Sequence, residues 1–344
     1  GFPSGVSLRV RIYKAGSLWA FVFLLTYPHG AMAFAGIDVA KSHLDLALTG
    51  DGARDPSQAR FDNTVEGIDQ LVEHLTEAAP ERVVLEATGG YERPACAALA
   101  AAGLPVAIVN PRQTRDFAKA TGRLAKTDTI DAGVLALFAE RIRPEVRPLA
   151  SEKQQAFSAL VARRRQLLKM RTAEKNRLRA ASSEAVEQSI EAVLAALDEQ
   201  INEAEAQLQE AVEESPMWQE RADLLKSVPG VGENTAYALI AELPELGAAN
   251  RQEIAKLVGV APLNCDSGQH RGQRTTWGGR ASVRRTLYMA TLVATQYNDR
   301  ISAFYHRLLD RGKAKKKALV ASMRKLLVIL NTMVKNGTTW NPDL

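Results

Sequence analysis

The sequence predicts an α/β domain, then a long helical region, then a mainly α-helical domain. Between residues 34 and 139, short apolar runs alternate with segments of helical spacing, which is typical of an α/β domain. Residues 151–214 contain no proline or glycine and therefore predict one or two long helices. The chain has 344 residues, 46% of them hydrophobic and 24% charged, which is the composition of a globular protein with two or three domains.

The first domain begins with the apolar run 34–40, a predicted buried strand with one carboxylate, Asp38. Further strands are predicted at 44–48, 59–62, 82–87 and 104–109. Helices are predicted after Thr64, with apolar positions from Val65 to Leu75, and at 91–102 and 127–139. The segment that follows Asn110-Pro111 is predicted to be a basic loop. The order β-β-β-α-β-α-β-α is that of the ribonuclease H-like fold.

Four carboxylates are expected to meet in this fold. Its first and fourth strands are neighbours, so Asp38 and Glu86 are predicted to lie side by side, and Asp128 and Asp131 share one helix face. Carboxylates that converge repel each other unless they bind cations, and oxygen-only ligands favour Mg²⁺ or Mn²⁺, the ions of phosphoryl transfer. Taken singly, each residue has an ordinary alternative role as a turn cap, a strand-end hydrogen-bond acceptor, a helix N-terminal charge or a solvated side chain.

Four motifs carry a family resemblance: 36–42 (GIDVAKS), 85–91 (LEATGGY), 109–113 (VNPRQ) and 126–132 (KTDTIDA). In this order they resemble the motifs of the DEDD transposases, insertion-sequence recombinases with a RuvC-like N-terminal domain. That family is related to pilin-gene invertases and to bridge-RNA-guided recombinases, and the similarity extends from residue 34 to about residue 340. The resemblance implies that Asp38, Glu86, Asp128 and Asp131 are the catalytic metal ligands.

The long helical region has a basic half and an acidic half. The basic half, which includes Arg163 and Arg164, is predicted to face nucleic acid because it lacks compensating acids. The acidic half has an apolar seam with 4-3 spacing: Ile190, Leu194, Leu197, Ile201, Ala204, Leu208 and Ala211. The seam predicts a coiled coil, within the chain or between subunits, or a helical hairpin that packs on its own domain.

Residues 224–240 have the helix-hairpin-helix pattern. Gly230 and Gly232 are expected to expose backbone amides to a phosphate at the start of the second helix, although a plain tight turn would have the same sequence.

A polar loop at 260–272 contains Ser267, which by composition alone is a turn residue. The family resemblance implies that Ser267 attacks a DNA phosphate and holds the strand as a phosphoserine ester; Cys265 and His270 are rival groups without a family match. Further cations are expected to contact nucleic acid: Arg271, Arg274, Arg280, Arg284, Arg285, Lys315, Lys316 and Lys317.

The predicted function is DNA transposition or site-specific recombination. The resemblance further implies element-end and target DNA as substrates, a structured guide RNA, and a dimer or tetramer whose active sites combine domains of different subunits. A hydrolytic RuvC-like nuclease or junction resolvase would not need Ser267, and a non-catalytic binding protein would not need Asp38. A sugar kinase or actin-like ATPase would need a second glycine-rich phosphate hairpin, which the sequence lacks.

The first 31 residues suit two interpretations. Basic residues precede the apolar run 18–25, as in a secretory leader, or Met32 is the true start and the segment is a mistranslated extension. The predicted regions are then the extension at 1–31, the RuvC-like catalytic domain at 32–148, the coiled-coil region at 149–220 and the serine-bearing domain at 221–344. The net charge of +5 permits a polyanionic partner, and the presence of only two cysteines in the sequence favours a reducing setting. The resemblance implies a bacterial, cytoplasmic, nucleoid-associated protein without a membrane partner.

Overall fold

The computed structural model divides into two compact units, Gly1–Leu149 and Ala150–Leu344, which are described separately. It describes the backbone of residues 7–15, 18–26, 32–50, 56–122, 128–146, 151–263, 266–267, 270–271 and 275–342. Side chains are described for residues 32–50, 56–122, 131–146, 151–262 and 275–342.

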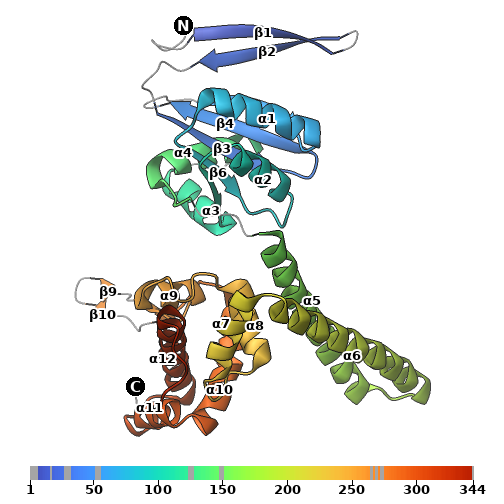
Figure 1. Ribbon diagram of the computed structural model, residues 1–344, viewed down its shortest axis with the longest axis vertical. Coiled ribbons are helices and arrows are strands. Elements are labelled where there is room, and N and C mark those ends of the chain that lie inside the picture. Colours follow the sequence, from blue (N-terminus) through green and yellow to red (C-terminus); the bar gives the residue numbers. More distant parts are fainter. Residues whose placement is uncertain are drawn as a thin grey trace. The chain divides into compact units, whose positions relative to one another are not determined.

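The first unit is built around a five-stranded sheet of order β5-β4-β3-β6-β7 (Figure 1). Its strands are β3 (Ala33–Val39), β4 (His43–Gly50), β5 (Ser57–Asp62), β6 (Arg82–Glu86) and β7 (Val106–Val109). The first three strands pair antiparallel, whereas β3, β6 and β7 are parallel. The prediction that the strand with Asp38 and the strand with Glu86 lie side by side is therefore confirmed.

Helices cover both faces of this sheet. They are α1 (Val65–Ala78), α2 (Arg93–Ala101), α3 (Pro111–Ala120) and α4 (Asp128–Ile142). Alternate strand residues such as Ile37 and Leu85 form one apolar core with α1 and α2. Phe34 of β3 and Val84 of β6 belong to the other set of alternate positions, which points the opposite way and packs against α4.

Gly36 sets how closely α4 approaches β3. A Cβ atom at this position would lie 2.1 Å from the backbone nitrogen of Ala136 and 2.4 Å from the carbonyl oxygen of Ala132. Because only glycine leaves room for this contact, the helix backbone lies directly on the strand.

Two expectations for the first unit need correction. The segment after Asn110-Pro111 is helix α3, not a loop: the Asn110 side chain accepts from the Arg112 amide and Pro111 occupies the first turn. Val65 belongs to α1 but is 73% exposed, so it is not part of the buried face. The backbone of the N-terminal extension forms a separate antiparallel hairpin of β1 (Ser7–Ala15) and β2 (Leu18–Thr26).

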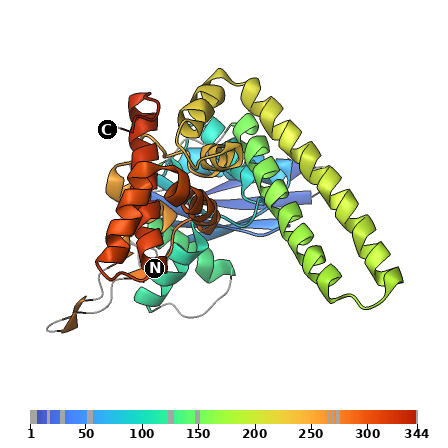
Figure 2. The same ribbon diagram turned by 90° about the horizontal axis from the view of Figure 1, so that it is seen from below.

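The second unit begins with a helical hairpin of α5 (Glu152–Ala180) and α6 (Glu184–Glu213) (Figure 2). The seam of α6 packs on α5 of the same chain: Leu197, Ile201 and Ala204 form an apolar cluster with Leu167. The intrachain helical hairpin is thus the arrangement found. At the base of the hairpin Val212, rather than the predicted Ala211, is fully buried.

In the described part of the second unit six further helices follow, and their apolar side chains form its core together with residues of α5 and α6. They are α7 (Pro216–Lys226), α8 (Glu233–Glu242), α9 (Arg251–Val258), α10 (Ala281–Tyr297), α11 (Asp299–Asp310) and α12 (Lys315–Asn336). Between α9 and α10 the backbone forms two short antiparallel ladders, β8 (Pro262–Leu263) with β11 (Thr275–Thr276) and β9 (Asp266–Ser267) with β10 (His270–Arg271).

Candidate active site

Asp38 and Glu86 lie at adjacent strand ends on one face of the sheet. The parallel register pairs Ile37 of β3 with Leu85 of β6, and each of these residues is followed directly by the carboxylate. Since successive strand residues point to opposite faces, both carboxylates are on the α4 face, away from the core that contains Ile37 and Leu85. Both are half-buried.

Helix α4 runs antiparallel to β3 and brings its first turn to the same end. Arg143, just after the helix, lies 5.3 Å from the Phe34 ring and 3.4 Å from a carboxylate oxygen of Glu81, so the helix ends where β3 and β6 begin. Its start, with Asp128 at the first position and half-buried Asp131 one turn later, is therefore at the carboxyl ends of those strands. The side chain of Asp128 lies outside the described residues.

Thr114 of α3 is a buried partner of Glu86 that the sequence alone did not reveal. Its hydroxyl donates to Glu86 Oε2 over 2.6 Å and also lies 2.9 Å from the carbonyl oxygen of Pro111. Thr114 is 4% exposed, and the edge-to-face contact of Phe117 with Phe138 packs its helix on α4. The Asn110-Pro111 pair was the available signal, because an N-cap residue followed by proline is typical of a helix start.

Asp45 is an acidic neighbour of Asp38 that was not predicted. It is the cross-strand partner of Asp38, is 7% exposed and forms a bidentate ion pair with Arg60 at 2.7 and 3.0 Å. Like charges on directly opposite residues are destabilising, so Arg60 offsets the charge of Asp45 beside Asp38. Asp45, Arg60 and Ala132 also line a cavity of about 270 Å³.

Glu92 holds the turn that follows the Glu86 strand. Its Oε2 accepts from the Thr88 amide at 3.1 Å, the Thr88 hydroxyl at 3.0 Å and the Gly90 amide at 2.8 Å. Burial by itself raises the pKa of Glu92, but hydrogen bonds from the backbone and from the Thr88 hydroxyl outweigh it, and the net pKa is lowered. Gly89 and Gly90 have positive φ angles of 83° and 126°, which favour glycine at both positions.

The donor chemistry at this edge fits a hard divalent cation. Asp38, Glu86 and Asp131 offer only carboxylate oxygens, the ligands that Mg²⁺ and Mn²⁺ prefer. Within the described part of the chain, however, no three Asp, Glu, His or Cys side chains are close enough together to hold an ion. The three described carboxylates share one edge of the sheet without forming a ready coordination shell.

Ser267 lies on β9, with its backbone paired to His270 of β10. The side chains of Ser267, Cys265, His270, Arg271 and Arg274 lie outside the described residues. The sequence predicts a polar loop with Ser267 as a turn residue, whereas the backbone at Ser267 forms a two-residue strand, β9, paired with β10.

The predicted helix-hairpin-helix consists of α7, a short turn and α8. Gly230 has a φ of 99°, and a Cβ atom there would lie 2.7 Å from the backbone of Ala294, so this glycine is required by packing against α10. Gly232 is the N-cap of α8, where no side chain caps the helix and a Cβ atom would meet nothing within 4 Å. Of the two glycines, Gly232 is the one that faces open space.

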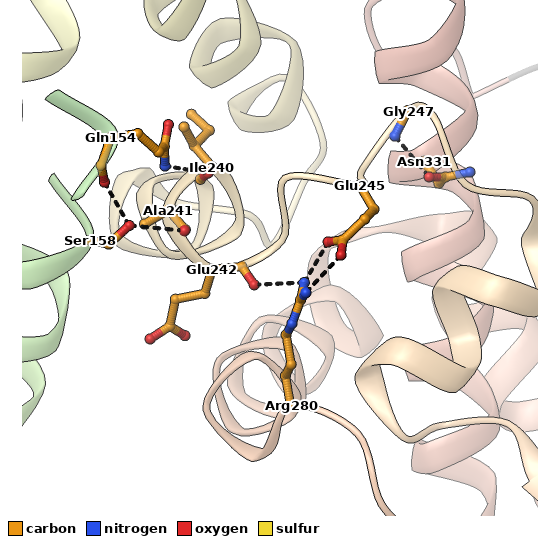
Figure 3. A network of polar contacts seen from close by, with 9 residues as sticks. All are labelled: Gln154, Ser158, Ile240, Ala241, Glu242, Glu245, Gly247, Arg280 and Asn331. Atoms are coloured by element: carbon orange, nitrogen blue, oxygen red, sulfur yellow. Dashed lines mark hydrogen bonds and ion pairs between the residues drawn. The ribbon is translucent and has the colours of Figure 1, made fainter. Parts of the chain in front are cut away.

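Arg280 has a role inside the second unit. Its guanidinium pairs with the Glu245 carboxylate at 2.5 and 2.7 Å and donates to the Glu242 carbonyl at the end of α8 (Figure 3). Gln154 and Ser158 of α5 donate to the two preceding carbonyl oxygens of α8, so side chains satisfy the backbone at this helix end.

The other predicted nucleic-acid contacts differ in their surroundings. Arg284 donates to the carbonyl oxygens of Val258 and Gly278, whereas Arg285 is exposed. On α5, Arg163 is exposed but Arg164 pairs with Glu205 at 2.7 Å. Compensating acids are therefore present, and the premise that the basic half of this region lacks them is wrong: Arg165 pairs with Glu242, Arg171 with Asp198 and Arg177 with Glu174. Lys315, Lys316 and Lys317 are exposed at the start of α12.

Comparisons with known proteins agree with the sequence motifs. A transposase family model of the DEDD, IS110 type matches residues 35–185, and a model described as the Transposase IS116/IS110/IS902 family matches residues 222–306. Pilin gene-inverting proteins of Moraxella bovis and Moraxella lacunata are each 26% identical over 316 residues, which is 88% of this chain and 96% of theirs. An insertion element IS110 protein of 43.6 kDa from Streptomyces coelicolor is 27% identical over 152 residues, 44% of this chain and 36% of the relative.

Among the described residues, no helix combines the length and the apolar composition that crossing a bilayer would require.

The two transposase models follow each other in order along the chain and together cover more than two thirds of it. The carboxylates at the edge of the sheet fall within the first match and Ser267 within the second. The chain belongs to the IS110 family of transposases and is a DNA transposase/recombinase.

Proposed function

We propose that this protein cuts and rejoins the DNA of an insertion sequence with four carboxylates and one serine. In this proposal the first unit contains a ribonuclease H-like catalytic domain at 32–148, and the domain at 221–344 supplies Ser267. The helical hairpin at 149–220 connects them. The pilin gene-inverting relatives, whose name describes DNA inversion, support recombination rather than simple cutting.

One observation carries the proposal. Asp38 and Glu86 end adjacent parallel strands on the face that α4 covers, and α4 starts at the same edge with Asp128 and Asp131. Without a cation such carboxylates repel each other, which is consistent with their separation among the described side chains. We expect Mg²⁺ or Mn²⁺ to draw these side chains together, and the bound ions would supply Lewis-acid stabilisation of phosphoryl transfer.

Ser267 is the proposed nucleophile. Its Oγ forms an ester bond to the DNA phosphorus while the bond from phosphorus to the leaving sugar oxygen breaks, and that oxygen takes up a proton. The ester conserves the energy of the broken bond, so a strand hydroxyl can later displace the serine and rejoin the DNA without ATP. Nearby arginines, among them Arg271 and Arg274, would stabilise the charge that develops on the phosphate.

The test is to trap the protein–DNA ester. Purified protein is incubated with element-end DNA and Mg²⁺, denatured, and resolved by gel electrophoresis. A covalent adduct is expected with the wild type and with Ser182→Ala, a matched change at an exposed serine between α5 and α6. Ser267→Ala and Asp38→Asn should both abolish it. DNA cleavage by Ser267→Ala at the wild-type rate would instead identify a hydrolytic nuclease.

We further propose that the active form is a dimer or tetramer guided by a structured RNA, which the resemblance of the sequence motifs implies. Mixing inactive Asp38→Asn and Ser267→Ala proteins tests the assembly. Restored adduct formation is expected if one subunit supplies the carboxylates and another supplies the serine. No recovery in mixed, co-refolded protein would mean that each chain uses its own pair.

A further inference from the structure

Two cations from two helices lie over one aromatic ring near the C-terminus, and the charge of a third acts on one of them. Lys325 Nζ of α12 lies 4.6 Å from the centre of the Phe304 ring of α11, and the Arg307 guanidinium carbon lies 5.3 Å from it. Lys325 Nζ also lies 3.4 Å from the backbone oxygen of Arg300. We refer to Arg300, Arg307 and Lys325 as the cation cluster.

Within the described part of the chain, the cation cluster has no carboxylate partner. Among the described residues, no carboxylate forms an ion pair with any of its three side chains. Helix α12 contains no Asp or Glu, and the two acids of α11, Asp299 and Asp310, do not pair with the cluster. This differs from α5, where four arginines have carboxylate partners.

Like charges held together in this way raise the free energy of the unbound protein. Burial lowers the pKa of Lys325, and the positive charges of Arg300 and Arg307 lower it further. The Phe304 ring offsets only part of this repulsion through cation–π contact. An anionic partner would offset the rest, so the cluster is better suited to a bound state than to the free one.

The surroundings of the cation cluster indicate what kind of anion it takes. A cleft of about 700 Å³ has Arg300 in its wall, together with Tyr297, Trp340 and Pro229 of the helix-hairpin-helix turn. Asp299 also lines this cleft, whereas Arg307 and Lys325 lie outside its lining. Tyr297 is 70% exposed. Exposed lysines follow at position 313, in the turn between α11 and α12, and at 315–317, at the start of α12. Spaced cations beside exposed aromatic rings are typical of surfaces that follow a nucleic-acid backbone.

We propose that Arg300, Arg307 and Lys325 bind phosphates of a nucleic-acid backbone that passes along the cleft beside Tyr297. This contact deepens the proposed recombinase function and rests on it, because DNA or guide RNA is then the polyanion. The contact is to phosphates and is therefore independent of base sequence.

The test combines a binding assay with a stability assay. Lys325→Met keeps the apolar stem and removes the charge, and Lys335→Met is the matched control because Lys335 is exposed on the same helix. Affinity for a random-sequence DNA duplex and for a hairpin RNA is measured over a series of salt concentrations. Loss of one phosphate contact should weaken binding roughly three- to tenfold at low salt and reduce the slope of log affinity against log salt by about 0.9 on duplex DNA.

The two probes identify which nucleic acid the cation cluster contacts, since the slope should change only on that one. Without nucleic acid, the melting temperature of Lys325→Met should equal or exceed that of the wild type, because a repulsion has been removed. A lower melting temperature with unchanged salt slopes on both probes would make the cation cluster purely structural and overturn this inference. If the wild type itself bound neither probe, the proposed function would fail instead.

Discussion

Replacement of Thr114 by valine tests how Glu86 is held, because it removes one hydroxyl and preserves the shape of the side chain. The hydroxyl lies 2.6 Å from Glu86 Oε2 and is only 4% exposed, so water has little access to replace the lost donor. A hydrogen bond to a charged group contributes about 1.5–3 kcal/mol. If that energy orients Glu86 in the transition state, its loss corresponds to a roughly 10- to 150-fold slower reaction.

Thr114 acts through Glu86 and is therefore a positioning residue, and the assay must separate this role from simple stability. Single-turnover rates of the protein–DNA adduct are measured for Thr114→Val and Thr114→Ser, with urea unfolding of each protein. The serine variant keeps the hydroxyl and should recover most of the rate, although loss of a buried methyl group costs it about 1 kcal/mol of stability. Folded Thr114→Val that reacts within twofold of the wild type would refute this role for the hydroxyl.

Three further outcomes are expected. Gly36→Ala should lower the free energy of unfolding by about 3 kcal/mol or more, because the new Cβ would lie 2.1 Å from the Ala136 backbone nitrogen; a loss below about 1 kcal/mol in urea titration would contradict this close packing. Glu92→Gln should cost about 1–3 kcal/mol at pH 7. The lowered pKa of Glu92 means that this stabilisation is present above its unfolded-state pKa of 4.5 and is lost as the pH falls through the folded-state value, so variant and wild type should converge in acid; a constant difference down to pH 2 would argue against it. Burial raises the pKa of Cys96 to about 12, so in a Cys265→Ser background this thiol should react with a disulfide reagent only as fast as the protein unfolds; rapid labelling of folded protein would show that it is accessible.

The sheet and its acidic edge were largely predictable. The apolar runs around Asp38 and Glu86 are local signals, and a pair of parallel strands with carboxylates at their ends follows from the element order. Helix α3 was not predicted because few of its side chains are apolar. Its stability depends on the Asn110 cap and on the packing of Phe117 against Phe138, a contact between distant residues.

Charge compensation was less predictable than secondary structure. Arg164 and Glu205 are 41 positions apart and Arg165 and Glu242 are 77 apart. The sequence of α5 alone therefore does not show which carboxylates pair with its arginines in the folded protein. Arg280 illustrates the same limit, since its partner Glu245 comes from a loop 35 positions earlier. A charge run in sequence records which residues are basic but not which acids face them.

By itself the sequence determined the membership in a transposase family and predicted the five strands of the sheet and the helices α1, α2 and α4, because these depend on local patterns and motifs. Only the tertiary structure decided which side chains lie together: Thr114 on Glu86, Arg60 on Asp45, and the cation cluster around Phe304. The reason is physical. A side chain's free energy depends on the neighbours that folding brings within a few ångströms, and those neighbours come from segments far away along the chain.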